Sequence, residues 1–145
     1  MKAAARLSVQ RGSRAAHIPA DRSLRAWAHA ALGRAAQVTL RYVGEAEGRR
    51  LNREFRGGDY ATNVLTFVYG DKPLQGDIVI CAPVVMREAR AQGKVLRAHH
   101  AHLLVHGLLH LQGLDHERDL DAVRMEARER AILRRLGFPD PYREK

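Results

Sequence analysis

The sequence is poor in cysteine and has no long apolar run. Cys81 is the one cysteine among 145 residues, so the chain cannot form an internal disulfide, and its composition fits a reducing compartment. No stretch of apolar residues is long enough to cross a bilayer. These absences argue against a disulfide-stapled secreted scaffold and against an integral membrane protein. We therefore expect a cytoplasmic protein that makes no membrane contact.

Acidic residues are scarce as well. The chain has 16 Asp and Glu against 25 Lys and Arg, which gives a net charge of +9. The excess lies mainly in residues 1–50, which carry ten basic and three acidic residues, whereas the other 95 carry fifteen and thirteen. This asymmetry indicates a polyanionic partner, with nucleic acid ahead of an anionic membrane surface. A solvated basic face on an arginine-rich chain would give the same count.

The length and the 46% hydrophobic composition fit one domain, which we expect to span residues 1–145. Alternating and β-branched patterns predict strands, and apolar residues at helical spacing with Gly or Pro at their ends predict helices. The grouping of strands before residue 82, followed mainly by helices, indicates an α+β fold. The expected strands cover 7–10, 37–43, 63–69 and 76–81, the last two as a hairpin, and the expected helices cover 23–36, 45–55, 83–92, 97–112 and 120–136.

A run of three histidines predicts a metal site. Residues 106–116 read His-Gly-Leu-Leu-His-Leu-Gln-Gly-Leu-Asp-His. His106 and His110 are four residues apart, so a helix places both imidazoles on one face, about one turn apart. Gly113 can adopt the left-handed conformation that ends a helix, and the following turn can bring His116 to the same ion. Three neutral nitrogen ligands with one open position are typical of a catalytic zinc site, so we predict one Zn²⁺ ion bound by His106, His110 and His116.

The neighbouring residues leave some roles open. His102 lies one turn before His106 on the same helix face and is an alternative to His116, although a straight helix carries it away from the predicted ion. We expect it to line the pocket or to support a ligand through a hydrogen bond. Asp115 either orients a ligand histidine or caps the next helix. Glu117 adjoins the third ligand, but its spacing defines no role.

The spacing His-x-x-x-His-x-x-Gly-x-x-His is also that of the metzincin peptidases. In those enzymes the residue after the first histidine is the glutamate that acts as general base. In this chain that residue is Gly107. A glycine inside a helix costs about 1 kcal/mol relative to alanine, which indicates that the position needs room. Peptide hydrolysis would lack its base, so a peptidase is a minor alternative.

Several blocks of the sequence resemble one bacterial family. The run 106–116 is similar to the signature of the YbeY family, rRNA maturation factors described as single-strand-specific endoribonucleases. Further similarity lies in residues 51–67, in 76–80 and in 125–137, so that the resemblance covers about residues 40–140 in the family's order. Ala61 stands where the family usually has proline, and Leu114 stands where it usually has an aromatic residue. Neither departure falls on a predicted ligand.

The resemblance implies an α+β fold with a small mixed sheet, a zinc ion held by the three histidines, and a functionally important arginine after the second helix. By motif position that arginine is Arg56. Its guanidinium matches phosphate geometry and stays charged at any working pH, as a catalytic role on a phosphodiester requires. The helix macrodipole alone would also favour an arginine there. The resemblance further implies single-stranded rRNA as substrate, 16S rRNA 3′-end processing and ribosome quality control as context, and a ribosomal subunit or ribosomal protein as partner.

A second hypothesis is a ribosome-assembly or RNA-binding factor in which the metal only stabilises the fold. A structural zinc site needs a fourth protein ligand. Cys81 and Asp115 are the candidates that the sequence offers. An exchangeable water on the metal would favour catalysis, whereas a fourth side chain would favour the structural hypothesis.

Overall fold

The computed structural model describes residues 5–114 and 119–143. These residues form four strands and five helices, which confirms the predicted α+β class. None of the described helices is both long and apolar enough to cross a membrane. The strands are β1 (Ala5–Arg11), β2 (Ala36–Val43), β3 (Val64–Asp71) and β4 (Leu74–Cys81), and the helices are α1 (Asp21–Ala31), α2 (Glu45–Arg56), α3 (Ala82–Gln92), α4 (Leu96–Leu111) and α5 (Asp119–Arg135).

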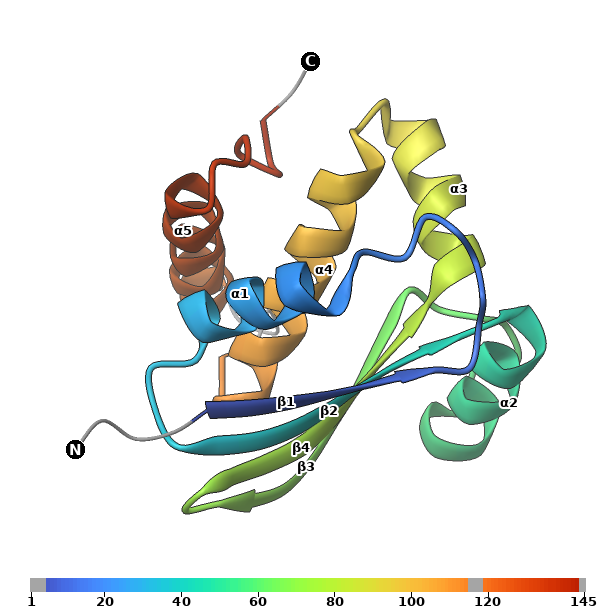
Figure 1. Cartoon of the computed structure of the whole chain (residues 1–145), viewed down its shortest axis with the longest axis horizontal. Coiled ribbons are helices and arrows are strands. Elements are labelled where there is room, and N and C mark those ends of the chain that lie inside the picture. The colour runs from blue at the N-terminus through green and yellow to red at the C-terminus, as the bar shows by residue number, and fades with distance from the viewer. Residues whose placement is uncertain (1–4, 115–118, 144–145) are drawn as a thin grey trace.

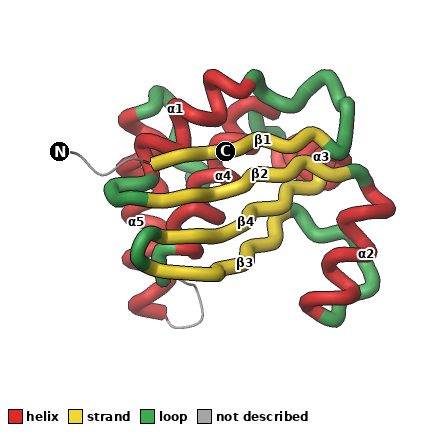
Figure 2. Tube along the Cα trace, turned by 60° about the horizontal axis from the view of Figure 1, so that its bottom comes forward, coloured by secondary structure: helices red, strands yellow, loops and turns green. Residues whose placement is uncertain are grey.

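The four strands lie side by side in one mixed sheet with the order β1-β2-β4-β3 (Figure 2). β1 pairs parallel to β2, and β2 pairs parallel to β4. β3 pairs antiparallel to β4 through the predicted hairpin, whose turn contains Lys72 and Pro73. Within the described residues, the outer edge of β3 therefore carries backbone groups that no other strand covers.

The two faces of the sheet are covered unequally. α1, α4 and α5 lie over one face, and α2 lies at the far end of the strands on the other side (Figure 1). Because side chains alternate along a strand, β4 contributes Ile78 and Ile80 to the large core beneath α4. Its Val79 and Cys81 belong to a small second core that Leu51 of α2 covers.

α4 packs on the sheet through Gly107. A Cβ atom at this position would lie 3.3 Å from both Cδ1 and Cγ2 of Ile78 and 3.5 Å from Cγ2 of Thr66. The expectation that this glycine provides room is therefore confirmed. The close approach directs the residue after His106 into the sheet, so a side chain at that position would face the core and not the cleft.

Two details differ from the sequence-based expectation. The first helix was expected to run over 23–36, but α1 ends at Ala31, because the backbone is extended from Leu32 and β2 begins at Ala36. Helical apolar spacing in the expected helix 120–136 predicts that Val123 faces inward, but 63% of its surface is exposed. α5 instead buries the face that carries Met125 and Glu129. Because Glu129 is charged, the apolar spacing did not identify this face as the buried one.

The close packing of α4 on the sheet can be tested at Gly76 of β4. A Cβ atom at Gly76 would lie 2.7 Å from the carbonyl oxygen of Phe67 and 2.9 Å from Cδ2 of Leu111 at the end of α4. Since the first contact is with backbone, Gly76→Ala should lower the free energy of unfolding by about 1–3 kcal/mol in a denaturant titration. The matched control is Gly33→Ala, because a Cβ atom there meets nothing within 4 Å. Equal stability of the two variants would contradict this packing.

Candidate metal centre and its cleft

Three histidines line one face of α4 at intervals of one turn. The ring centroids of His102 and His106 are 6.2 Å apart, and those of His106 and His110 are also 6.2 Å apart. The side chains become more accessible along the helix, from 13% exposed at His102 to 23% at His106, and His110 is exposed. The predicted pair His106 and His110 is therefore side by side and open to a cleft.

The hydrogen bond of His106 defines which nitrogen can bind a metal. Its Nδ1 lies 2.8 Å from a carboxylate oxygen of Glu129 in α5. The carboxylate can only accept, so Nδ1 carries the proton and Nε2 carries the lone pair of the neutral ring. A metal-binding histidine is commonly oriented by such a carboxylate.

His110 is oriented in the same way by backbone. Gly113 has φ of 97° and ends α4 in the left-handed conformation that the sequence predicts. The turn brings the carbonyl oxygen of Leu114 to 2.7 Å from Nδ1 of His110. That nitrogen must donate, which again leaves the lone pair on Nε2. The predicted third ligand, His116, lies outside the described residues, as do Asp115 and Glu117.

Glu129 is the buried charge of this region. Its side chain is 0% exposed and accepts hydrogen bonds from His102 Nε2 at 2.7 Å, from His106 Nδ1 and from the Tyr142 hydroxyl. Burial by itself would raise the pKa of Glu129, but the hydrogen bonds from both histidines and the tyrosine outweigh it and hold the pKa at about 2. The carboxylate is therefore ionised, and its negative charge favours cations beside it.

The same contacts define a group that could hold a metal ion by itself. Ligand atoms of His102, His106 and Glu129 all lie within 4.8 Å of one another. Their separations of 2.7 and 2.8 Å are hydrogen-bond lengths. Two ligands that each lie about 2 Å from a tetrahedral ion are more than about 3 Å apart. The observed geometry therefore fits a carboxylate that orients two histidines better than a carboxylate that shares an ion with them.

Arg56 reaches the same cleft from the opposite wall. It is the last residue of α2, where Gly57 ends the helix with φ of 80°. Its guanidinium donates to the carbonyl oxygen of Thr66 on the outer edge of β3 and lies 5.0 Å from the ring centroid of Phe67. A cavity of about 400 Å³ is lined by Arg56 together with His106 and His110. Residues that are about fifty positions apart in the sequence thus face one another.

The loop before β3 completes the wall. Thr62 and Asn63 line the cavity. The Asn63 side-chain amide donates to both carboxylate oxygens of Glu88 at 3.1 and 3.2 Å. Glu88 in turn accepts from Nε2 of His99 at 2.9 Å, which ties the loop to α3 and α4. The loop is therefore held by side-chain hydrogen bonds.

Sequence reasoning did not identify Glu129 or Tyr142. The signal that could have found Glu129 is its spacing from Met125, Ile132 and Leu133, which places it on the buried face of α5. Tyr142 lies in the C-terminal segment, and no periodic pattern marks it. Its burial and its hydrogen bond to Glu129 raise the pKa of the hydroxyl, which remains a donor.

Cys81, a predicted candidate for a fourth ligand, lies on the other side of the sheet. Its Sγ atom is 3.6 Å from the carbonyl oxygen of Gly44 and belongs to the small core beneath α2. Burial raises the pKa of its thiol. Cys81 therefore does not reach the cleft that contains His106 and His110.

The fold and the site define a small α+β protein whose histidine pair faces an arginine across a cleft. The chain belongs to the endoribonuclease YbeY family, whose model matches residues 14–137. A relative from Aromatoleum aromaticum named endoribonuclease YbeY is 58% identical, covering 94% of this chain and 91% of that protein. A relative of the same name from Nitrosomonas europaea is also 58% identical, covering 94% of this chain and 84% of that protein.

Two further comparisons concern length and fold. A relative of the same name from Azoarcus sp. strain BH72 is 56% identical over 94% of this chain, and the chain spans 59% of that protein's length. The solution structure of TM1509 from Thermotoga maritima matches 96% of this chain and 100% of its own chain with a TM-score of 0.54. At 21% sequence identity this second likeness concerns the fold alone.

The role of Glu129 can be tested by removing its charge. Glu129→Gln should weaken zinc binding by about 10- to 100-fold, since the orienting carboxylate is lost while the side-chain size is kept. Competition with a chromophoric chelator measures the affinity. Glu126→Gln is the matched control, because Glu126 is on the same helix and pairs with Arg130 at 3.6 Å. Equal affinities of the two variants would show that Glu129 does not support the metal centre.

Proposed function

We propose that the chain is a zinc-dependent endoribonuclease that cleaves single-stranded rRNA during ribosome maturation. The observation that carries the proposal is the arrangement of His106 and His110, with Nδ1 of each bound to an acceptor, opposite Arg56 in one cavity. The name of the relatives, endoribonuclease YbeY, supports the same reaction. The net charge of +9 suits a polyanionic substrate. We further propose 16S rRNA 3′-end processing in the cytoplasm, and a ribosomal subunit or protein as the partner.

The donor set of the site fits a borderline metal. Two neutral imidazoles with their lone pairs on Nε2 are ligands that zinc favours, and the buried carboxylate behind His106 strengthens the basicity of that ring. We propose that His116 supplies the third ligand, so that His106, His110 and His116 hold one Zn²⁺ ion. An ion bound in this way supplies Lewis acidity, which polarises a phosphoryl oxygen and lowers the pKa of a bound water.

The protein side chains have separate roles in the proposed reaction. Arg56 binds the scissile phosphate and stabilises the negative charge that grows on its oxygens in the transition state. Its hydrogen bond to Thr66 and its contact with the Phe67 ring fix the guanidinium before the substrate arrives. Asn63, held by Glu88, shapes the wall against which the RNA backbone lies. Glu129 positions His106 and, as an ionised buried group, does not act as an acid.

The alternative functions find less support. A peptidase of the metzincin type needs a carboxylate at the position of Gly107, and that position faces Ile78 in the core. A purely structural metal site needs a fourth protein ligand; of the two candidates, Cys81 lies beneath α2 on the other face of the sheet, and Asp115 lies outside the described residues.

The ligand set can be tested with two histidine variants of the same helix. His110→Ala should abolish stoichiometric zinc binding, since a proposed ligand is lost. His102→Ala should retain it, because His102 contacts Glu129 and has no proposed bond to the ion. Metal content after dialysis, measured by mass spectrometry, gives the result. The opposite outcome, with zinc lost in His102→Ala and kept in His110→Ala, would assign the ion to His102, His106 and Glu129.

The role of Arg56 can be tested without disturbing the metal. Arg56→Ala should lower the cleavage rate of a labelled single-stranded rRNA fragment by about 10²- to 10³-fold, as expected for a lost transition-state donor. Zinc content should be unchanged. Arg53→Ala is the matched control, because Arg53 lies on the same helix and is exposed but is not a lining residue of the cavity. Full activity of Arg56→Ala would remove Arg56 from the mechanism.

A further inference from the structure

The cleft beside His106 continues in both directions as a series of cavities that share lining residues. On one side, Arg56 and His110 also line a shallow cavity over Val68 and Tyr69 of β3. On the other side, Asn63 and His106 also line a cavity of about 210 Å³ that extends to Lys94 and Tyr142. Together these cavities form a groove that runs past the candidate metal centre.

The groove ends in a larger apolar cavity of about 450 Å³. It lies between the start of α4 and the C-terminal segment, which run beside each other in Figure 1. It shares Gln92, Lys94, His99 and His102 with the preceding cavity. Its size falls in the range of small-molecule sites. The apolar wall is formed by Val95, Ala98, Leu133, Pro139 and Pro141.

This wall is unusual for a protein surface. Val95 is 69% exposed, although it is an apolar residue at the start of a helix. Val95, Ala98 and the two prolines offer an apolar surface against which the face of an unpaired base can pack. A base within a duplex is stacked and paired and could not enter such a cavity. The cavity would therefore select single strands.

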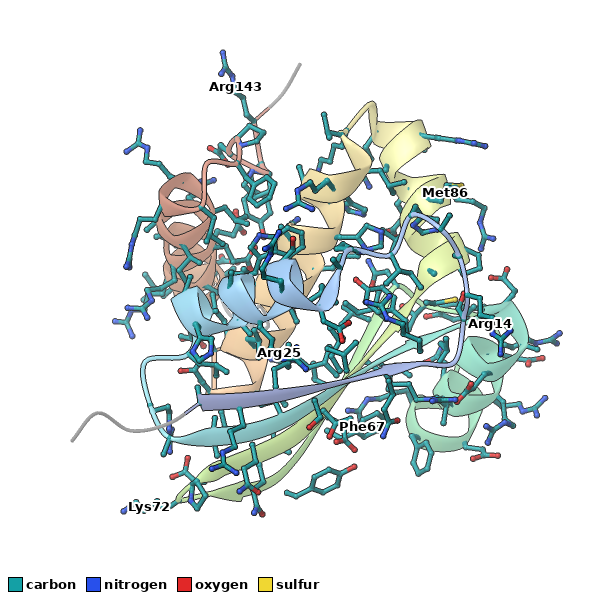
Figure 3. All side chains as sticks on the ribbon, in the orientation of Figure 1. Arg14, Arg25, Phe67, Lys72, Met86 and Arg143 are labelled. Carbon is teal, nitrogen blue, oxygen red and sulfur yellow. The ribbon has the colours of Figure 1, made fainter. Side chains whose placement is uncertain are left out.

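The rim carries the basic residues Lys94 and Arg143 and the acidic residue Asp140, and Glu88 lines the adjoining cavity. Lys94 lines both the apolar cavity and the one beside His106, so this residue lies where the two meet. Arg143 lines the far side and projects from the C-terminal segment in Figure 3. The acidic residue of the rim, Asp140, is bound to Arg130 at 3.2 Å, and its pKa is lowered by hydrogen bonds to the Tyr142 backbone N–H and to Arg130. Its charge is therefore compensated by a partner outside the cavity.

We propose that this cavity is a subsite for one unpaired nucleobase of the RNA substrate. The ribose-phosphate backbone passes from the cleft between Arg56 and His106 to Lys94, which binds a phosphate, and the base then inserts against Val95, Ala98 and the prolines. A single strand can insert an unpaired base into this subsite, whereas a duplex cannot, and this difference explains a preference for single-stranded RNA. This inference rests on the proposed function for its substrate class.

The binding step can be observed without any cleavage. The probes are a short oligoadenylate and adenosine 5′-monophosphate, titrated into the 145-residue chain that carries ¹³C-labelled methyl groups, in the presence of EDTA. The methyl signals of Val95, Ala98 and Leu133 should shift with both probes. The same oligoadenylate paired with oligouridylate in a duplex should leave them unchanged. Unmoved signals in the cavity, while signals elsewhere shift with the single strand, would overturn the proposal.

Variants then connect the cavity to substrate use. Ala98 is partly exposed in the first turn of α4, so Ala98→Trp should fill the cavity, with circular dichroism to verify folding. We expect about a tenfold weaker affinity for the oligoadenylate, as for the loss of one base contact. Lys94→Gln should weaken binding and reduce its salt dependence. Ala127→Leu, an exposed position of α5, is the control and should bind like the native chain.

The outcomes separate this inference from the proposed function. Shifted cavity signals with no zinc-dependent cleavage would support the subsite while the nuclease proposal fails. Cleavage with equal oligoadenylate affinity in folded Ala98→Trp, Lys94→Gln and Ala127→Leu would leave the nuclease proposal intact and overturn the subsite.

Discussion

The buried carboxylate of Glu129 is the interaction on which the candidate site depends. It is inaccessible to solvent and receives hydrogen bonds from His102, His106 and Tyr142. A buried charge is costly unless it is fully hydrogen-bonded, so these three donors must stay in place for α5 to dock on α4. The same bonds fix the His106 ring and bring the C-terminal segment against the start of α4. One side chain therefore links stability, ligand orientation and the shape of the groove.

The rest of the fold presents the other wall of the cleft. Gly107 and Gly76 let α4 approach the sheet closely, which places the histidine face of the helix beside the outer edge of β3. The hairpin leaves this edge without a neighbouring strand, and Arg56 uses one of its carbonyl groups as a fixed acceptor. The candidate metal centre and the arginine that we propose binds phosphate are thus held by packing within the chain itself.

Much of this arrangement could be predicted from the sequence, because the informative signals are local. The four-residue spacing of His106 and His110, and Gly113 after them, predicted a helix with two neighbouring histidines and the end of that helix. Arg56 was identified through the family resemblance, because the residues around it do not indicate that the end of α2 lies near α4. Glu129 was missed because an acidic residue at a helical position normally indicates a solvated face, and its burial depends on donors from two distant segments. The position of His116 stays a prediction.

The most direct test of this account is the protonation pattern of the histidine rings in the zinc-loaded chain. A long-range ¹H–¹⁵N NMR spectrum distinguishes a protonated ring nitrogen from one bound to a metal. We predict that His106 and His110 both carry their proton on Nδ1 and bind zinc through Nε2, while His102 has no nitrogen bound to the metal. Zinc bound to Nδ1 of His106, or to His102, would contradict the account, because Glu129 would then share the ion with these histidines.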